Sequence, residues 1–180
     1  MKTIMINDEQ IVTKKTLPND VVIAEVACLL KTQPAVILPV KGYSMLPFII
    51  GDRESIELVL PTKESLRVND VVLAWVQSTT TLHLPPSEAP HYYVVHRIVY
   101  VDGDCLTLMG DGNVHGMEKC CKEDVVALAT HVIDSHDHRH YLYTPRRLWL
   151  VKKWRQLYKY RRWILAIYKR TWLKIVMWMP

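Results

Sequence analysis

The order of apolar and polar positions predicts one short helix followed by a run of β-strands. Apolar residues recur at helical spacing from Asp20 to Lys31, Asn19 or Asp20 stands at the N-cap position, and Pro34 follows the end. Beyond this helix, short stretches rich in valine, isoleucine and tyrosine predict strands at 35–40, 54–60, 71–77, 92–101, 104–109 and 124–133. The serine-, threonine- and proline-rich residues 78–90 predict a loop or the tip of an extended hairpin.

A second periodic stretch lies near the C-terminal end, over Leu148–Met179. At about 100° per residue, apolar and aromatic side chains from Trp154 to Val176 fall on one face and basic side chains on the other, although Arg161 breaks the pattern. This composition is typical of a basic amphipathic helix lying among lipid headgroups, and its frequent charges exclude a membrane-spanning helix. One alternative is a helix packed on the domain or on a partner. Nucleic-acid binding ranks last, because no nucleic-acid-binding fold accompanies the basic and aromatic residues.

Charge is divided unevenly between the two parts of the chain. The sequence has 23 Lys+Arg and 18 Asp+Glu, and all 18 acidic residues precede Arg146. Residues 1–145 therefore carry a net charge of −6, and residues 146–180 carry 11 basic residues and no acidic one. Five of the six tryptophans also lie in this last segment. Because each Lys or Arg near an anionic surface contributes about 1 kcal/mol, we expect peripheral membrane association through Leu148–Met179, on the cytoplasmic side.

The same patterns divide the chain into four parts. They are an N-terminal segment with the amphipathic helix (1–34), a β domain (35–133), a histidine-rich connector (134–147) and the basic aromatic tail (148–180). The first 18 residues are polar and mixed in charge, so we expect neither a signal peptide nor an N-terminal transmembrane helix. At 180 residues, a single core of sufficient size is expected.

Cysteine and histidine usage gives no sign of a cofactor. The four cysteines (Cys28, Cys105, Cys120 and Cys121) lack C-x-x-C spacing, and the adjacent pair is poorly suited to a disulfide, which favours a reducing compartment. Histidine-rich tracts can bind metal, and one is formed here by His131, His136, His138 and His140. This tract contains no cysteine and lies in the predicted connector, so we expect no metal site and no cofactor.

Residues 42–47 read Gly-Tyr-Ser-Met-Leu-Pro and directly follow an apolar strand. A serine hydroxyl is a weak nucleophile that needs a base and a site for the oxyanion. A tight corner lifts the Ser44 hydroxyl off the sheet and turns backbone N–H groups toward the same point. Gly42 allows a close backbone approach, and Pro47 fixes φ at the end of the corner. Alone, Ser44 would be an ordinary turn serine.

Four further features follow the corner in a definite order. Gly51-Asp52 comes first, Asn69-Asp70 opens a strand, His96-Arg97 lies within the strand 92–101, and Gly110-Asp111-Gly112-Asn113 ends the next strand. With this set, residues 35–130 resemble the type I signal peptidases and the self-cleaving LexA-like peptidases. In these families a Ser-Met-x-Pro corner holds the nucleophile. Most members use a lysine base, whereas the eukaryotic, archaeal and spore-former type uses a histidine in a Val-His-Arg setting before a Gly-Asp-Asn turn.

The resemblance implies a mainly β, signal-peptidase/LexA-like fold and a histidine-type serine site. Ser44 would attack a scissile carbonyl, and His96 would accept the proton and return it to the leaving amine. Asp111 would orient the imidazole, with Glu118 as the alternative acid, because the histidine-type peptidases carry another carboxylate shortly after the Gly-Asp turn. Asp111 is also a residue type that any β-turn favours. Lys41 is a competing base, but it lies on the strand that leads into the serine, so we assign it a surface role.

One departure from the family concerns the oxyanion. Signal peptidases usually have a serine two positions before the nucleophile, and here that position is Gly42. The LexA-like branch also has glycine there, so the oxyanion hole is expected from backbone groups at Gly42, Ser44 and Met45, with the Ser44 N–H as the main donor.

The resulting prediction is a serine endopeptidase at a membrane surface. Its substrate would be an extended segment of an exported or precursor peptide, bound as an additional strand beside the sheet. The alternative is a catalytically inactive relative that serves as a binding or scaffold module. A self-cleaving repressor is less favoured, because no DNA-binding helix pair precedes the β domain and the lysine base is missing.

Overall fold

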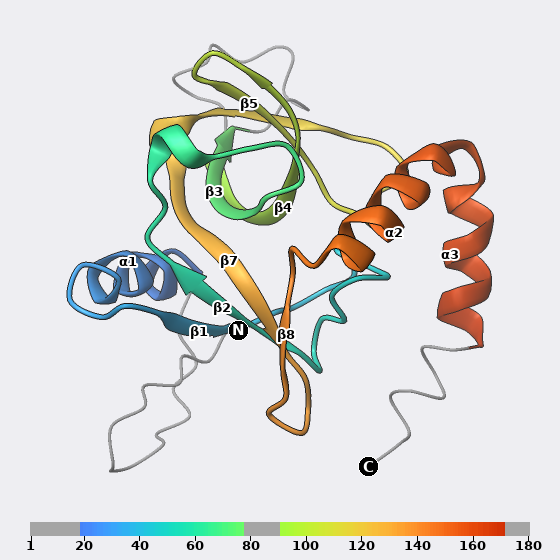
Figure 1. The fold of residues 1–180 in the computed structure, drawn as a ribbon, viewed down its shortest axis with the longest axis horizontal. Coiled ribbons are helices and arrows are strands. Elements are labelled where there is room, and N and C mark those ends of the chain that lie inside the picture. Colours follow the sequence, from blue (N-terminus) through green and yellow to red (C-terminus); the bar gives the residue numbers. More distant parts are fainter. Residues whose placement is uncertain (1–18, 78–90, 172–180) are drawn as a thin grey trace.

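The computed structural model describes residues 19–77 and 91–171, and its main feature is a strongly curled antiparallel sheet (Figure 1). The strands are β1 (Val36–Pro39), β2 (Ser55–Val59), β3 (Val71–Gln77), β4 (His91–Asp102), β5 (Cys105–Met109), β6 (Glu118–Cys121), β7 (Val125–Ile133) and β8 (Arg139–Tyr141). The helices are α1 (Asn19–Leu29), α2 (Pro145–Gln156) and α3 (Arg161–Arg170), with 3-10 turns η1 (Lys63–Ser65), η2 (Lys122–Asp124) and η3 (Tyr158–Tyr160). The prediction of a mainly β fold is confirmed.

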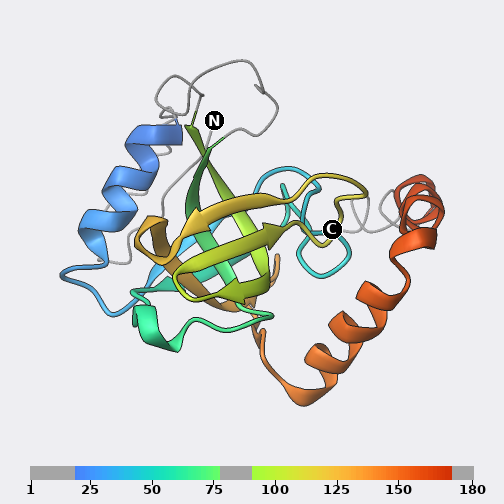
Figure 2. The same cartoon turned by 90° about the horizontal axis from the view of Figure 1, so that it is seen from above.

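The strands do not follow one another in sequence order. Along the sheet the order is β1-β2-β7-β3-β4-β5-β6, with β8 paired to β7, and all of these pairings between described strands are antiparallel. Register shifts interrupt the pairing of β2 with β7, β3 with β7, and β4 with β5. Such irregularities bend strands and increase their twist, which accounts for the curl. Helix α1 lies at one side of the curled sheet and the α2–α3 pair at the other (Figure 2).

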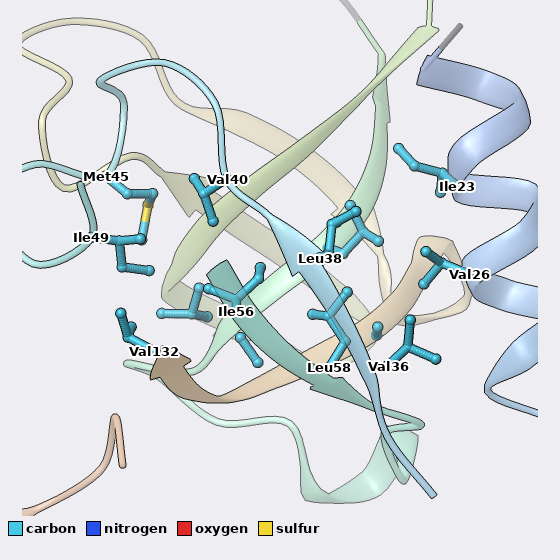
Figure 3. Close-up of a cluster of buried hydrophobic side chains, with 14 of the residues drawn as sticks. Ile23, Val26, Val36, Leu38, Val40, Met45, Ile49, Ile56, Leu58 and Val132 are labelled. Atoms are coloured by element: carbon cyan, nitrogen blue, oxygen red, sulfur yellow. The ribbon is translucent and has the colours of Figure 1, made fainter. Parts of the chain in front are cut away.

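The main core lies between α1 and the strands β1, β2, β3 and β7. Ile23 and Val26 of α1 pack toward β1 and β2, where Leu38 and Ile56 are fully buried (Figure 3). Met45, from the segment after β1, points into the same core. Burying a side chain of this size stabilises a fold by about 1.5–3 kcal/mol. Met45 therefore anchors the corner that contains Ser44 to the core.

The elements predicted from hydrophobic patterning are present within a few residues of their expected bounds. The expected helix from Asp20 to Lys31 is α1, and the six expected strands correspond to β1 to β5 and β7. Strand β6 was missed, and part of the predicted connector 134–147 is strand β8. The N-terminal residues 1–18 and the predicted loop 78–90 lie outside the described residues.

The prediction of one continuous helix over Leu148–Met179 was wrong. Helix α2 begins at Pro145, after Thr144, whose Oγ1 accepts from the N–H of Arg147 at 3.3 Å, and the chain then turns through η3 into α3. Trp154 and Leu165, which were expected on the lipid-facing side, are buried against the β domain with Leu46 and Ile50. This apolar burial favours the turned arrangement over a straight helix.

The rest of the predicted tail helix, residues 172–179, lies outside the described residues. Over the part of the chain that is described, the helices are too short or too polar to cross a bilayer.

Candidate active site

The serine corner is closed by the chain that follows it. The N–H of Asp52 donates to the carbonyl of Val40 at 2.8 Å, and the N–H of Ile50 donates to the Glu54 carboxylate at 2.6 Å. Desolvation raises the pKa of Glu54, although the Ile50 hydrogen bond opposes the shift. Residues 40–54 therefore form a compact loop that presents Ser44 at its start.

Three glycines bring the other motifs into direct contact with this corner. A Cβ on Gly110 would lie 2.4 Å from the carbonyl oxygen of Ser44, and one on Gly112 would lie 2.5 Å from that of Tyr43. The N–H of Gly112 donates to the Ser44 carbonyl at 2.7 Å. On the other side, a Cβ on Gly51 would lie only 1.9 Å from the Gly42 carbonyl oxygen. The Gly-Asp and Gly-Asp-Gly motifs thus allow close backbone packing around Ser44.

Ser44 and His96 line the same cavity, which has a volume of about 130 Å³. Its walls come from the end of β1 and from β4. Lys41 also lines the cavity, and its side chain is exposed to solvent. Within the described residues no hydrogen bond joins the Ser44 hydroxyl to His96. Nucleophile–base contacts are commonly long in unliganded sites and tighten when substrate binds.

The carboxylate beside His96 belongs to Glu118. The Nδ1 of His96 lies 3.0 Å from Oε2 of Glu118, and both side chains are largely buried. Glu118 is the first residue of β6, and pairing with Leu108 of β5 fixes its position. A proton on Nδ1 that is donated to Glu118 leaves the lone pair on Nε2 free to accept another.

Asp111, the first choice for this role, binds Arg97 instead. The Arg97 Nε donates to Oδ1 of Asp111 at 2.9 Å and Nη2 donates to Oδ2 at 2.7 Å, with both residues buried. Nη1 donates to the carbonyl of Asn69 at 2.7 Å. Successive residues of a strand point to opposite faces, so His96 and Arg97 need separate carboxylates. Asp111 therefore holds the turn that supports Ser44.

Helices α2 and α3 support the same turn from outside, a role that the sequence patterns did not reveal. The indole N–H of Trp154 donates to the carbonyl of Asp111 at 2.7 Å, and Arg161 Nη1 donates to that of Asn113 at 2.9 Å. The Tyr158 hydroxyl donates to the Val114 carbonyl at 2.8 Å. In the sequence, the one indication of this packing was Arg161, a basic residue on the predicted apolar face of the tail helix.

Backbone donors for an oxyanion are present at the corner. Among the described residues, the N–H groups of Ser44 and Met45 have no hydrogen-bond acceptor, whereas that of Leu46 donates to the Tyr43 carbonyl at 3.3 Å. Gly42, with φ of +79°, adopts the left-handed conformation that begins the corner. Unpaired N–H groups at such a corner can bind an oxyanion.

The histidine-rich segment makes contacts of another kind. His138 and His140 both contact the Asp134 carboxylate, at 3.3 and 3.1 Å, and His131 contacts Glu57 at 2.9 Å. Across the described ranges, no three His, Cys, Asp or Glu side chains are grouped in a way that would hold a metal ion.

Comparisons of the chain with protein-family models, with curated proteins and with solved structures find no match. Its function is therefore inferred from the residues of the site.

Proposed function

We propose that the protein is a serine endopeptidase in which Ser44 is the nucleophile, His96 the general base and Glu118 the carboxylate that orients His96. One observation carries this proposal. A buried histidine, bound through Nδ1 to a buried carboxylate, lines the same cavity as a serine held in a glycine-supported corner. Structural ion pairs also bury histidines, but they do not need an adjoining serine with unpaired backbone donors beside it.

In the proposed mechanism, each step of acyl transfer is assigned to a residue of the site. Ser44 Oγ attacks the scissile carbonyl while its proton passes to His96 Nε2, and the N–H groups of Ser44 and Met45 bind the oxyanion. His96 then gives the proton to the leaving amine, which leaves the acyl group on Ser44. A water molecule, deprotonated by His96, hydrolyses this ester and restores the serine. Glu118 stabilises the imidazolium in both steps.

An extended peptide is the substrate that suits this site. The cavity is lined by Leu38 to Lys41 at the end of β1, and β1 lies at one end of the strand order with β2 as its neighbour. A peptide added along this strand would gain main-chain hydrogen bonds and pass its scissile bond over Ser44. The signal-peptidase-like fold expected from the motifs favours an exported or precursor peptide.

A serine-reactive fluorophosphonate tests the enzyme proposal. We expect labelling of the wild type, no labelling of Ser44→Ala and labelling roughly 10²–10⁴ times slower for His96→Ala, the range that a general base contributes. Ser135→Ala, at an exposed serine, is the matched control and should label like the wild type. Labelling that persists without Ser44, or none in the wild type, would instead favour the inactive binding module.

The exposed face of η3 and α3 supports a membrane-surface location. Tyr160, Trp163 and Ile167 are 63%, 72% and 65% exposed and follow helical spacing along one face. Lys159 and Arg162 are exposed beside them. Aromatic side chains next to basic ones match an anionic lipid surface in both apolar and charged character.

Vesicle co-sedimentation tests this location. We expect full-length protein to bind vesicles containing phosphatidylglycerol, and Trp163→Ser with Ile167→Ser to reduce binding without lowering the unfolding temperature. Tyr100→Ser, which removes an exposed aromatic side chain from β4, is the control. Removal of all residues after Thr144 would not isolate the membrane contribution. It would also remove α2 and α3, which support the Gly110–Asn113 turn. Binding to RNA but not to vesicles would reject the membrane proposal.

A further inference from the structure

A second cavity, of about 250 Å³, lies between the helices α2 and α3 and the turn at Gly110 and Asp111. Its lining residues are different from those of the pocket that contains Ser44. Val99, Met109 and Met117 give it an apolar wall on the sheet side. The helical side is formed by Arg155, Tyr158 and Arg161, so a charged wall faces an apolar one.

Arg161 is the most unusual of these residues, because its side chain is buried without a carboxylate. It is only 2% exposed, and Nη1 donates to the Asn113 carbonyl at 2.9 Å, but Nε is buried and has no hydrogen-bond partner. The rings of Trp154 and Tyr158 hold the guanidinium at 5.5 and 5.2 Å. Desolvation lowers the pKa of Arg161, as expected for a cation that lacks a close counter-ion.

The surroundings leave this wall with uncompensated positive charge. Arg155 lines the same cavity and donates to neutral acceptors, Asn69 Oδ1 at 3.2 Å and the Val99 carbonyl at 3.0 Å. In the described part of the chain, neither Arg155 nor Arg161 forms a salt bridge. Asp111 is near, but Arg97 already occupies both of its carboxylate oxygens. A buried guanidinium without a counter-ion is costly, so an anion at this wall would stabilise it.

We propose that this cavity binds a phosphate group, carried by a small molecule or by a lipid headgroup, through Arg155 and Arg161. Guanidinium groups match phosphate oxygens with paired hydrogen bonds, and two positive charges suit a dianionic phosphomonoester. The apolar wall of Val99, Met109 and Met117 offers a place for an apolar substituent on that phosphate. This cavity shares no lining residue with the Ser44 cavity, so the phosphate proposal does not depend on the peptidase proposal.

Calorimetric titration with phenyl phosphate and with inorganic phosphate, at constant ionic strength, tests the site. We expect binding by wild type and a loss of affinity of about tenfold or more in Arg155→Gln, the effect of removing a charged hydrogen bond. Arg146→Gln removes the same charge at an exposed position of α2 and should bind like wild type. Arg161→Gln should behave like Arg155→Gln, provided that its unfolding curve shows a folded protein.

No binding of either compound at millimolar concentration, or equal affinities in Arg155→Gln and Arg146→Gln, would overturn the proposal. Ser44→Ala should bind phenyl phosphate with wild-type affinity, so failure of the peptidase proposal leaves this result unaffected. Competition distinguishes the sources of the phosphate. Displacement of phenyl phosphate by phosphatidic acid vesicles, and not by phosphatidylcholine vesicles, indicates a lipid headgroup; binding without displacement indicates a soluble phosphomonoester.

Discussion

His96 and Glu118 form a buried pair, with Nδ1 of the imidazole 3.0 Å from Oε2 of the carboxylate. The two residues come from β4 and β6, which are not neighbours in the sheet, because β5 lies between them. The contact therefore crosses a strand and depends on the register of both ladders. It holds the His96 ring beside the cavity that Ser44 also lines. The proposed chemistry therefore depends most on Glu118 after Ser44 and His96.

Substitution Glu118→Gln should slow the reaction of Ser44 while leaving the fold intact. An amide cannot stabilise an imidazolium, and it can hold the ring in the wrong tautomer, so we expect fluorophosphonate labelling to fall roughly 10²-fold or more. Glu123→Gln, at an exposed carboxylate of η2, is the control. Wild-type labelling rates in Glu118→Gln would show that this carboxylate has no part in the reaction.

Substitution Asp111→Asn should act on stability. It leaves the buried Arg97 guanidinium without a counter-charge, and breaking such a pair typically costs about 3–5 kcal/mol. Chemical denaturation measures the loss of unfolding free energy. Asp104→Asn, in an exposed pair with Lys122, should change stability by less than about 1 kcal/mol. A fully stable Asp111→Asn variant with slow labelling would return Asp111 to the catalytic role first expected for it.

The sequence motifs favoured Asp111 as the carboxylate beside His96, whereas the structure places Glu118 there. The serine corner, the histidine strand and the Gly-Asp-Gly turn were all found from the sequence, and the structure brings them into contact. The choice between Asp111 and Glu118 depends on which face of β4 each one meets. Because His96 and Arg97 are adjacent in a strand, alternation predicts two acids on opposite faces. Strand β6 was missed, so the position of Glu118 remained undefined.

The tail illustrates a different limit. A helical period is the same whether the apolar face meets lipid or protein, so the pattern alone could not place Trp154 and Leu165. Arg161 was the discordant residue on that face, and the structure shows why: its guanidinium binds the Asn113 carbonyl inside the protein. No proline or glycine marks the break between the helices at η3. The break follows from packing against the β domain, which the sequence pattern does not reveal.

Gly110→Ala should disturb Ser44 through the backbone. The new Cβ would lie 2.4 Å from the Ser44 carbonyl oxygen, so the turn and the corner must separate. Overpacking of this kind costs roughly 1–3 kcal/mol, and we expect labelling of Ser44 to fall further than stability does. Gly103→Asn is the control, because open space surrounds that position and asparagine tolerates its φ of +56°. Normal labelling of Gly110→Ala would mean that the corner does not need this close contact.

Cys105 and Cys121 face each other across β5 and β6, and both are exposed. The N–H of Lys122 donates to the Asp104 carbonyl at 2.9 Å, so alternation makes the next pair, Cys105 and Cys121, a non-hydrogen-bonded one. Cα atoms in such pairs lie about 4.5 Å apart, within the range of a disulfide. Added oxidised glutathione should therefore oxidise the two thiols to a disulfide while it is itself reduced to two thiols.

This disulfide would enclose residues 106–120, which contain both the turn that supports Ser44 and Glu118. Closing a loop of that length stabilises a fold by up to about 3 kcal/mol, so the unfolding midpoint should rise on oxidation. Desolvation, and then the Asp124 carboxylate, raise the pKa of Cys121 above 9.0, so the reaction should accelerate further as pH increases beyond that value. Mass spectrometry detects the disulfide as a loss of two hydrogens. We expect this loss in the wild type and in the control Cys28→Ser, and not in Cys105→Ser. Glutathione adducts without an internal cross-link in the wild type would show that the two strands do not hold these thiols together.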